Sequence, residues 1–395
     1  MSAARPGDRS EDRRTDNARC PTDRADHVRI GAESVAFDPP QGAGLSSEQA
    51  RVAASAITPC PEPLRPVFLH GLWRSGSTYV WSRFRVTPCT LCFYEPLHDG
   101  LRRLTAERIR RDTPDSIKDN HHPELAQPYF AEFAPLLARR GVRGYQRRFA
   151  YSRFAPRRDE PDAALEAYVQ SLIDRAREHD RSAVLGFNRT GLRVAWLRDR
   201  FDACNIHIDR DPIDIFSSYL GQLQSGNYYY FTKWMQIIAG NRDYPLFKEA
   251  LSKIPRPNLI EKLLVRPKTF YRNIIDDVSL DTLYSITFLA WVVCCLHALE
   301  HCDLIIDIAR ADQAGYSQAI AAALRRHSGL SVSFDDMHAP SPPSPLRLVR
   351  QRTIERDVLD WIRTSAPDGL LDRSRIRRRL DELSPRRAEL LAQVV

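Results

Sequence analysis

The chain has 395 residues, of which 43% are hydrophobic and 27% are charged, a composition that is ordinary for a globular protein. Its 58 Lys and Arg residues outnumber 50 Asp and Glu residues, and the net charge of +8 favours anionic ligands without selecting nucleotides, sulfated sugars or nucleic acid. No stretch reaches the roughly 18 to 20 apolar residues of a membrane span, because the longest candidate, Ile286 to Leu299, is interrupted by Thr287 and His297. The N-terminus lacks a secretory apolar region, so we expect a cytoplasmic protein with no membrane span.

The first 62 residues are rich in Arg, Asp, Ser and Pro and show little periodicity, which predicts a disordered or loosely attached leader. The eight cysteines show no disulfide framework, and Cys89-x-x-Cys92 lacks the second pair of ligands that a zinc site needs. We therefore expect all eight to be reduced thiols, most of them in the core.

A phosphate-binding loop is predicted near the start of the folded region. The apolar run Val67 to Leu69 indicates a buried strand, and a helix is expected from about Thr78 to Arg85. Small residues between them let backbone N–H groups approach an anion, and the helix N-terminus points further N–H groups at the same place. The run Gly71 to Thr78 fits G-x-x-x-x-G followed by a hydroxyl residue, but Ser77 replaces the Walker A lysine, which disfavours nucleotide hydrolysis. A cation stands earlier in the loop, at Arg74.

The second expected strand, Thr90 to Tyr94, ends in Glu95-Pro96-Leu97-His98. Because proline forces the preceding residue away from helix, Glu95 lies at the strand's exit, the edge of a parallel sheet where ligands bind. The residues from Gly100 to about Asp180 are basic and helical in pattern, and they predict an insertion or lid. Its helix candidates are Leu101 to Arg111, Pro128 to Arg140 and Pro161 to His179.

Strands and helices continue to alternate over the rest of the chain. The expected strands are Ala183 to Phe187, Asn205 to Asp209 and Asp303 to Ile308; the expected helices are Leu192 to Phe201, one starting at Asp211-Pro212, Leu283 to His301 and Gln313 to His327. This alternation predicts an α/β fold with an open, mainly parallel, P-loop-like sheet and helices on both faces. We expect this domain to cover residues 63–338.

A Pro/Ser linker, Ala339 to Pro345, introduces the remaining region, residues 339–395, which we expect to be helical. Its arginines fit a solvated or interface face better than a nucleic-acid site, since no aromatic residues interleave with them. They are Arg373, Arg375, Arg377, Arg378, Arg379, Arg386 and Arg387.

A second anion-binding motif follows the fourth expected strand. Arg210 stands at the strand's exit, and Ser218 comes eight residues later, two turns into the next helix. Ser218 is seven residues after the cap residue Asp211, so it returns to the same helix face and can point its hydroxyl toward a group held by the arginine. One fixed cation with one hydroxyl donor suits a terminal phosphate.

These motifs together resemble those of sulfotransferases that use 3′-phosphoadenosine 5′-phosphosulfate (PAPS). Arg74-Ser75-Gly76-Ser77-Thr78 resembles their 5′-phosphosulfate loop, and Arg210 with Ser218 resembles their 3′-phosphate motif. The segment Phe93 to His98 is similar to a Phe-Glu-Pro-Leu segment that follows this loop in the carbohydrate sulfotransferases. The resemblance covers scattered motifs from Pro66 to Ser218 and the helix and strand that reach about Asp307. It favours the carbohydrate or bacterial branches, because the late Arg-Lys-Gly signature and the catalytic histidine of the cytosolic branch have no clear counterpart; Arg347, Arg350 or Arg352 could substitute for the former.

The resemblance implies transfer of a sulfuryl group from PAPS to an acceptor hydroxyl, with 3′,5′-adenosine bisphosphate (PAP) as product and no metal. The 5′-phosphate is expected to bind the loop, with Arg74 stabilising the leaving oxygen. The 3′-phosphate is expected at Arg210 and Ser218. The full set of expected donor-binding residues is Arg74, Ser75, Gly76, Ser77, Thr78, Tyr79, Arg210 and Ser218.

Glu95 is the expected general base, with His98 as the fallback. An alternative is that Glu95 is a structural carboxylate paired with an arginine such as Arg74. Asn188 and Arg189 are expected to line the acceptor or adenine pocket. The aromatic residues Tyr228, Tyr229, Tyr230 and Trp234 are either a platform for a sugar ring or core residues.

Two other functions stay open. A P-loop kinase or hydrolase could use Asp307 to bind magnesium, and a non-catalytic nucleotide-binding protein could have the same fold. A saccharide is the favoured acceptor, while a lipid, a small alcohol or a protein tyrosine stays possible. The sequence favours small-molecule partners over nucleic acid and does not indicate an oligomeric state.

Overall fold

The computed structural model describes residues 65–111, 125, 127–254, 267–340 and 350–365. They belong to one compact unit, Pro59–Val395. The expected leader, most of the Pro/Ser linker, Arg347 and the arginines from Arg373 to Arg387 lie outside the described residues.

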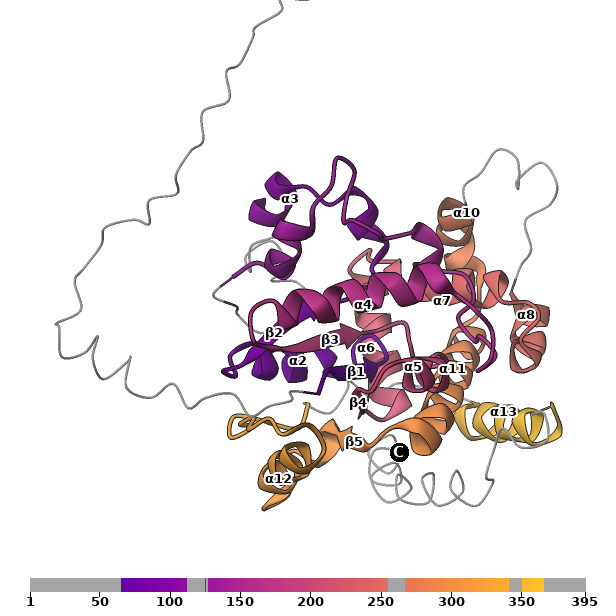
Figure 1. The fold of residues 1–395 in the computed structure, drawn as a ribbon. Coiled ribbons are helices and arrows are strands. Elements are labelled where there is room, and N and C mark those ends of the chain that lie inside the picture. The colour runs from indigo at the N-terminus through magenta and orange to yellow at the C-terminus, as the bar shows by residue number, and fades with distance from the viewer. Residues whose placement is uncertain (1–64, 112–124, 126, 255–266, 341–349, 366–395) are drawn as a thin grey trace, which may run out of the picture. The chain divides into compact units, whose positions relative to one another are not determined.

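A five-stranded, all-parallel sheet forms the centre of this unit, with the strand order β2-β3-β1-β4-β5 (Figure 1). All five strands were predicted from apolar runs bounded by turn residues. They are β1 (Val67–Gly71), β2 (Thr90–Tyr94), β3 (Ser182–Phe187), β4 (Cys204–Asp209) and β5 (Leu304–Asp307). The parallel α/β class is therefore confirmed.

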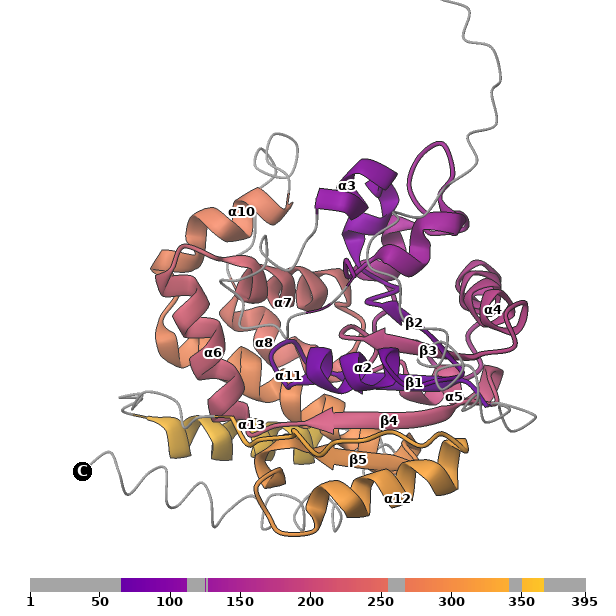
Figure 2. The ribbon, with the colours of Figure 1, turned by 90° about the vertical axis from the view of Figure 1, so that its left-hand side faces the viewer.

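Helices cover both faces of the sheet, because successive side chains of each strand point to opposite sides. On one side Phe68 packs in a cluster with residues of α4 and α5, and on the other Val67 and Leu69 pack with residues of α2 and α12. Figure 2 shows α12 lying along β5. The described α-helices are α2 (Ser77–Arg85), α3 (Ala106–Arg111), α4 (Ala163–Arg177), α5 (Val194–Arg200), α6 (Pro212–Gln224), α7 (Tyr229–Gly240), α8 (Lys248–Lys253), α10 (Pro267–Ile274), α11 (Leu280–His301), α12 (Tyr316–Ser328) and α13 (Gln351–Ser365).

The insertion between β2 and β3 is less helical than predicted. The predicted helix Pro128 to Arg140 is wrong: only a short 3₁₀ turn, η3 (Ala131–Leu136), forms there, and it contains Pro135, which has no N–H to donate. The predicted helix Leu101 to Arg111 splits into the 3₁₀ turn η1 (Asp99–Arg103) and α3, because Leu104 adopts an extended backbone with ψ 134°. The predicted helix Pro161 to His179 is confirmed as α4.

The long helix α11 is a core helix, as predicted. By length and composition it is also apolar enough to cross a membrane, which corrects the expectation that no stretch reaches that limit. However, 83% of its most apolar window is buried within the protein. The C-terminal helix α13 packs against α11, where its Val358 and Ile362 join the same buried cluster.

The prediction that every cysteine is a reduced thiol is wrong for Cys89, which is disulfide-bonded. Cys89 lies in the turn before β2, half-buried and with φ 69°, so it is not one of the core thiols that were expected. The other described cysteines, Cys92, Cys204, Cys294, Cys295 and Cys302, are free. Cys20 and Cys60 lie outside the described residues.

The buried histidine of β1, His70, leads us to expect that the protein becomes less stable in acid. It is fully buried between Thr190 and Asn205, and burial lowers its pKa to about 3. Between pH 6.5 and pH 3 the unfolded chain therefore binds a proton that the folded chain does not, so stability falls as the pH falls. We expect this group to reduce the free energy of unfolding by about 2 kcal/mol between pH 7 and pH 5.

Urea unfolding at pH 7 and pH 5 measures this loss, with His70→Gln as the comparison. Glutamine keeps a donor and an acceptor but does not titrate, so the variant should lose about 2 kcal/mol less than the wild type over this interval. Equal losses would show that His70 is protonated in the folded protein.

Candidate functional site

The loop between β1 and α2 has the geometry of an anion cradle. Arg74 has φ 66° and Gly76 has φ 88°, and Ser75 closes the turn through its N–H and its Oγ, both of which donate to the Leu72 carbonyl at 3.3 and 2.8 Å. Gly76 is the N-cap of α2 and supplies no side chain to the first-turn N–H groups. The positive end of α2 is thus left to face a ligand.

Gly76→Ala is expected to lower stability and to weaken anion binding. A left-handed backbone costs a residue with a Cβ about 1–2 kcal/mol, and a Cβ at Gly76 would also lie 3.0 Å from Ile308 Cγ1. Gly315→Ala is the matched control, because Gly315 has φ 76° with no atom within 4 Å of an added Cβ. Thermal unfolding should show the larger loss for Gly76→Ala, and phosphate binding should fall in that variant alone. If the two variants lose the same stability and bind phosphate equally well, then the close packing of Gly76 against Ile308 does not matter for the loop.

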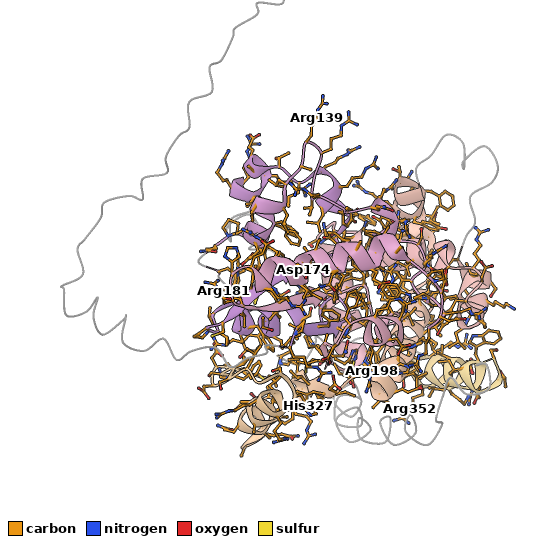
Figure 3. The ribbon with its side chains drawn as sticks, viewed as in Figure 1. Arg139, Asp174, Arg181, Arg198, His327 and Arg352 are labelled. Atoms are coloured by element: carbon orange, nitrogen blue, oxygen red, sulfur yellow. The ribbon has the colours of Figure 1, made fainter. Side chains whose placement is uncertain are left out.

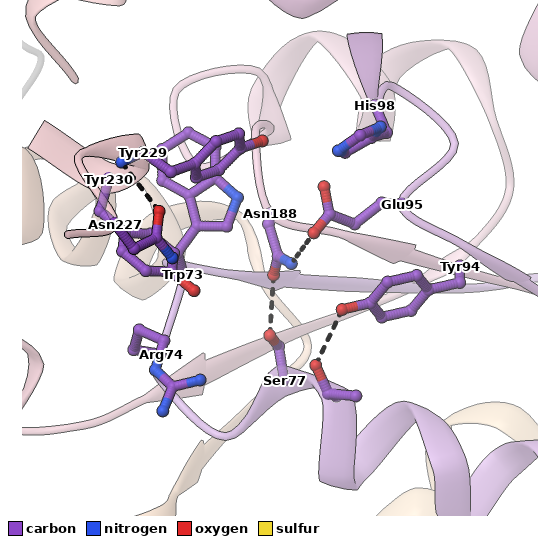
Figure 4. A pocket seen from close by; sticks show the side chains of 11 residues that line it. Trp73, Arg74, Ser77, Tyr94, Glu95, His98, Asn188, Asn227, Tyr229 and Tyr230 are labelled. Atoms are coloured by element: carbon purple, nitrogen blue, oxygen red, sulfur yellow. Dashed lines mark hydrogen bonds between the residues drawn. The ribbon is translucent and has the colours of Figure 1, made fainter. Parts of the chain in front are cut away.

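A pocket of about 250 Å³ opens beside this loop (Figure 4). Of the residues predicted to be catalytic or to bind the donor, the structure brings five to its wall: Arg74, Ser77, Thr78, Glu95 and His98. Three residues that were considered for the acceptor or adenine pocket also line it: Asn188, Tyr229 and Tyr230. The remaining lining residues are Trp73, Tyr94 and Asn227. The loop after β1 and the segment after β2 therefore meet at one site, as their positions at the carboxyl ends of parallel strands predict.

Tyr79 does not join this group. Its hydroxyl donates to Asp336 Oδ1 at 2.7 Å, and it lines a different pocket. Thr78 does face the site, where its Oγ1 lies 3.0 Å from the Tyr94 hydroxyl.

Arg210 and Ser218 lie next to Arg74 and not on the pocket wall. Arg74 Nε donates to Ser218 Oγ at 2.8 Å, and Arg210 Nη1 donates to the Arg74 carbonyl at 3.1 Å. Arg210 Nε also lies 3.5 Å from Asp214 Oδ2. The two predicted anion motifs are thus joined through Arg74, a contact that the sequence did not indicate.

The carboxylate of Glu95 is held at the edge of the pocket. Its residue has φ 40°, and its backbone N–H donates to the Gly186 carbonyl at 2.9 Å, which continues the β2–β3 pairing by one residue. Glu95 Oε1 accepts a hydrogen bond from Asn188 Nδ2 at 2.9 Å, and Oε2 lies 3.5 Å from Arg189 Nη1. The arginine paired with Glu95 is therefore Arg189 and not Arg74.

His98 is a weak base in this setting. Burial lowers its pKa to about 4, so its ring is neutral at pH 7. Its Nδ1 accepts a hydrogen bond from the Gly100 N–H at 3.0 Å, which caps η1. Both side chains line the pocket, but the Nδ1 of His98 is already used to cap η1.

A buried charge network supports this side of the pocket, and sequence reasoning missed most of it. Arg189 and Lys233 are 1% and 0% exposed, and both contact Asp99, at 3.6 and 3.0 Å. Burial acts to raise the pKa of Asp99, but the positive charges of Arg189 and Lys233 hold it well below its usual range. The one feature of the sequence that could have indicated this network is Lys233, a lysine among the apolar residues of α7.

The aromatic residues divide between the pocket and the core. Tyr229 and Tyr230 line the pocket together with Trp73, which sequence reasoning missed. Trp234 is buried in the core, and the Tyr228 hydroxyl donates to Asp276. Arg189 lies 5.2 Å over the Trp73 ring and donates to the Tyr229 hydroxyl at 2.5 Å, so the aromatic wall is attached to the charge network.

The arginines suggested for the late part of the 3′-phosphate site do not reach the pocket. Arg350 and Arg352 are exposed, and Arg352 extends from α13 in Figure 3. Asp307, the magnesium ligand expected of a kinase, caps η7 (Ile308–Arg310) through Ala309 N–H at 3.0 Å and does not line the pocket. Within the described ranges no group of three His, Cys, Asp or Glu side chains is arranged to hold a metal ion.

Comparison with known proteins does not assign the chain to a family. The chain matches no protein-family model, and no curated protein matches it significantly.

Proposed function

We propose that this protein is a sulfotransferase of P-loop-like fold, which moves a sulfuryl group from PAPS to an acceptor hydroxyl. The observation that carries the proposal is the meeting of the β1–α2 loop and Glu95 at one pocket. A cradle for the donor's phosphate and a candidate base for the acceptor's proton then face the same space.

The donor's 5′-phosphate would bind the first-turn N–H groups of α2 and the hydroxyl of Thr78. Arg74 lines the pocket beside this cradle, where it would stabilise charge on the oxygen that leaves with the phosphate. Arg210 and Ser218, both hydrogen-bonded to Arg74, would hold the 3′-phosphate. That second site would favour PAPS over plain adenine nucleotides.

In the proposed step Glu95 takes the proton from the acceptor hydroxyl. The acceptor oxygen forms a bond to sulfur while the bond between sulfur and the 5′-phosphate oxygen breaks, and PAP leaves with that electron pair. The protein's part is to align the two oxygens and to stabilise the developing charge, as in phosphoryl transfer. No step requires a metal.

We propose a saccharide hydroxyl as the acceptor. The pocket wall includes the aromatic side chains of Trp73, Tyr229 and Tyr230, which would contact the apolar parts of a sugar ring. A carboxylate and an amide, Glu95 and Asn188, supply hydrogen-bonding groups for ring hydroxyls.

Calorimetric titration with 3′,5′-adenosine bisphosphate and with ADP, both without magnesium, tests this proposal. Tight binding of the bisphosphate with weak binding of ADP is the expected result, since only the bisphosphate fills both phosphate sites. Equal binding of the two, or binding that needs magnesium, would contradict the sulfotransferase function and favour a P-loop kinase or hydrolase. Binding without turnover of PAPS would favour the non-catalytic alternative.

A further inference from the structure

Three side chains form a hydrogen-bonded line across the pocket, from the phosphate loop to the candidate base (Figure 4). Ser77 Oγ donates to Asn188 Oδ1 at 2.7 Å, and Asn188 Nδ2 donates to Glu95 Oε1 at 2.9 Å. Ser77 is the first residue of α2, whereas Asn188 and Glu95 follow β3 and β2 directly.

The strand order explains why Asn188 occupies the middle. β3 lies between β2 and β1 in the sheet. The residue that follows β3 is therefore between the loop after β1 and the carboxylate after β2. Asn188 is 6% exposed, so its amide is fixed among protein groups and is not a surface side chain.

The chemistry of the line requires an amide at its centre. An ionised carboxylate only accepts hydrogen bonds, so the NH₂ group of Asn188 must face Glu95 and its carbonyl oxygen must face the Ser77 hydroxyl. A carboxylate side chain would repel Glu95, and an alanine would contact neither neighbour. Arg189 lies next to the other oxygen, Oε2, so the carboxylate is held from two sides.

We infer that Asn188 is a positioning residue, which holds Glu95 in the orientation that accepts the acceptor's proton and fixes that orientation relative to the phosphate loop. The inference rests on the proposed function. It assigns Asn188 no contact with the sulfuryl group. Because a reacting group displaced by about 1 Å can cost up to about 100-fold in rate, loss of this bond should act on kcat.

Asn188→Ala is expected to lower kcat for sulfuryl transfer by about 10- to 100-fold, with little change in the affinity for 3′,5′-adenosine bisphosphate. The decisive comparison is with Glu95→Gln. If Asn188 acts through Glu95, then adding Asn188→Ala to Glu95→Gln should lower kcat hardly further, because the carboxylate that Asn188 positions is already absent. Transfer is followed with labelled sulfate from PAPS, and binding is followed by calorimetry.

Asn205→Ala is the matched control. Asn205 is a fully buried amide that bonds His70 and the Ala203 carbonyl, away from the pocket. Its loss should lower stability, and any effect on kcat should be the same in the wild-type and the Glu95→Gln backgrounds. If Asn188→Ala does not fold, Asn188→Ser, which is smaller and cannot span both neighbours, takes its place.

The outcomes separate the inference from the function on which it rests. Full kcat in Asn188→Ala, or a loss that persists undiminished beside Glu95→Gln, would overturn the positioning role while leaving the sulfotransferase function intact. A wild-type chain that neither binds 3′,5′-adenosine bisphosphate nor transfers sulfate would overturn both.

Discussion

Glu95→Gln is expected to reduce sulfuryl transfer by about 10²–10⁴-fold, the range for loss of a general base. Glutamine has nearly the same shape and still accepts a hydrogen bond from Asn188, but it takes no proton from the acceptor. The affinity for 3′,5′-adenosine bisphosphate should change little, because Glu95 lies across the pocket from Arg74 in Figure 4. Initial rates with labelled PAPS and calorimetry on the same preparation measure the two quantities.

Glu132→Gln provides the control for removing a buried carboxylate from an ion pair. Glu132 is 10% exposed and pairs with Arg85 at 2.7 Å, and neither residue lines the candidate site. Its substitution should lower stability without a comparable loss of kcat. Unchanged transfer in Glu95→Gln would instead assign Glu95 a structural role as the partner of Arg189.

The strands were predictable because their signals are local. Val67 to Leu69 and Ile206 to Ile208 are buried segments next to turn residues, and parallel strands need such continuous buried runs. The position of Glu95 at a strand exit followed from Pro96 alone. The prediction of a helix over Pro128 to Arg140 was wrong because it relied on the helical sequence pattern and gave too little weight to Pro135. Proline has no N–H to donate, so it interrupts the backbone hydrogen bonds of a helix.

The side chains that complete the site depend on strand order, which no local pattern specifies. The order β2-β3-β1 brings Asn188 between Ser77 and Glu95, although these residues are 111 and 93 positions apart in the chain. Similarly, Arg74 and Ser218 are 144 residues apart and meet only because β1 and β4 are neighbours. Sequence reasoning could name residues of the right chemistry, but not the pairs that they form.

Arg74 allows a test that separates charge from backbone strain. Its φ of 66° is unfavourable for arginine and easy for glycine, so Arg74→Gly should retain or raise stability while removing the guanidinium. We expect kcat to fall by about 10²–10³-fold, as when one group that stabilises developing charge is lost. Urea unfolding and initial rates of transfer measure the two effects.

Arg74→Lys completes the comparison. Lysine retains a positive charge but cannot reproduce the planar Nε–H that Arg74 donates to Ser218 at 2.8 Å. If charge on the leaving oxygen is what matters, Arg74→Lys should recover part of the rate that Arg74→Gly loses, and urea unfolding should rank the glycine variant as the more stable. If both variants keep the wild-type kcat, Arg74 serves only to connect the loop with α6, and leaving-group stabilisation must come from the N–H groups of α2.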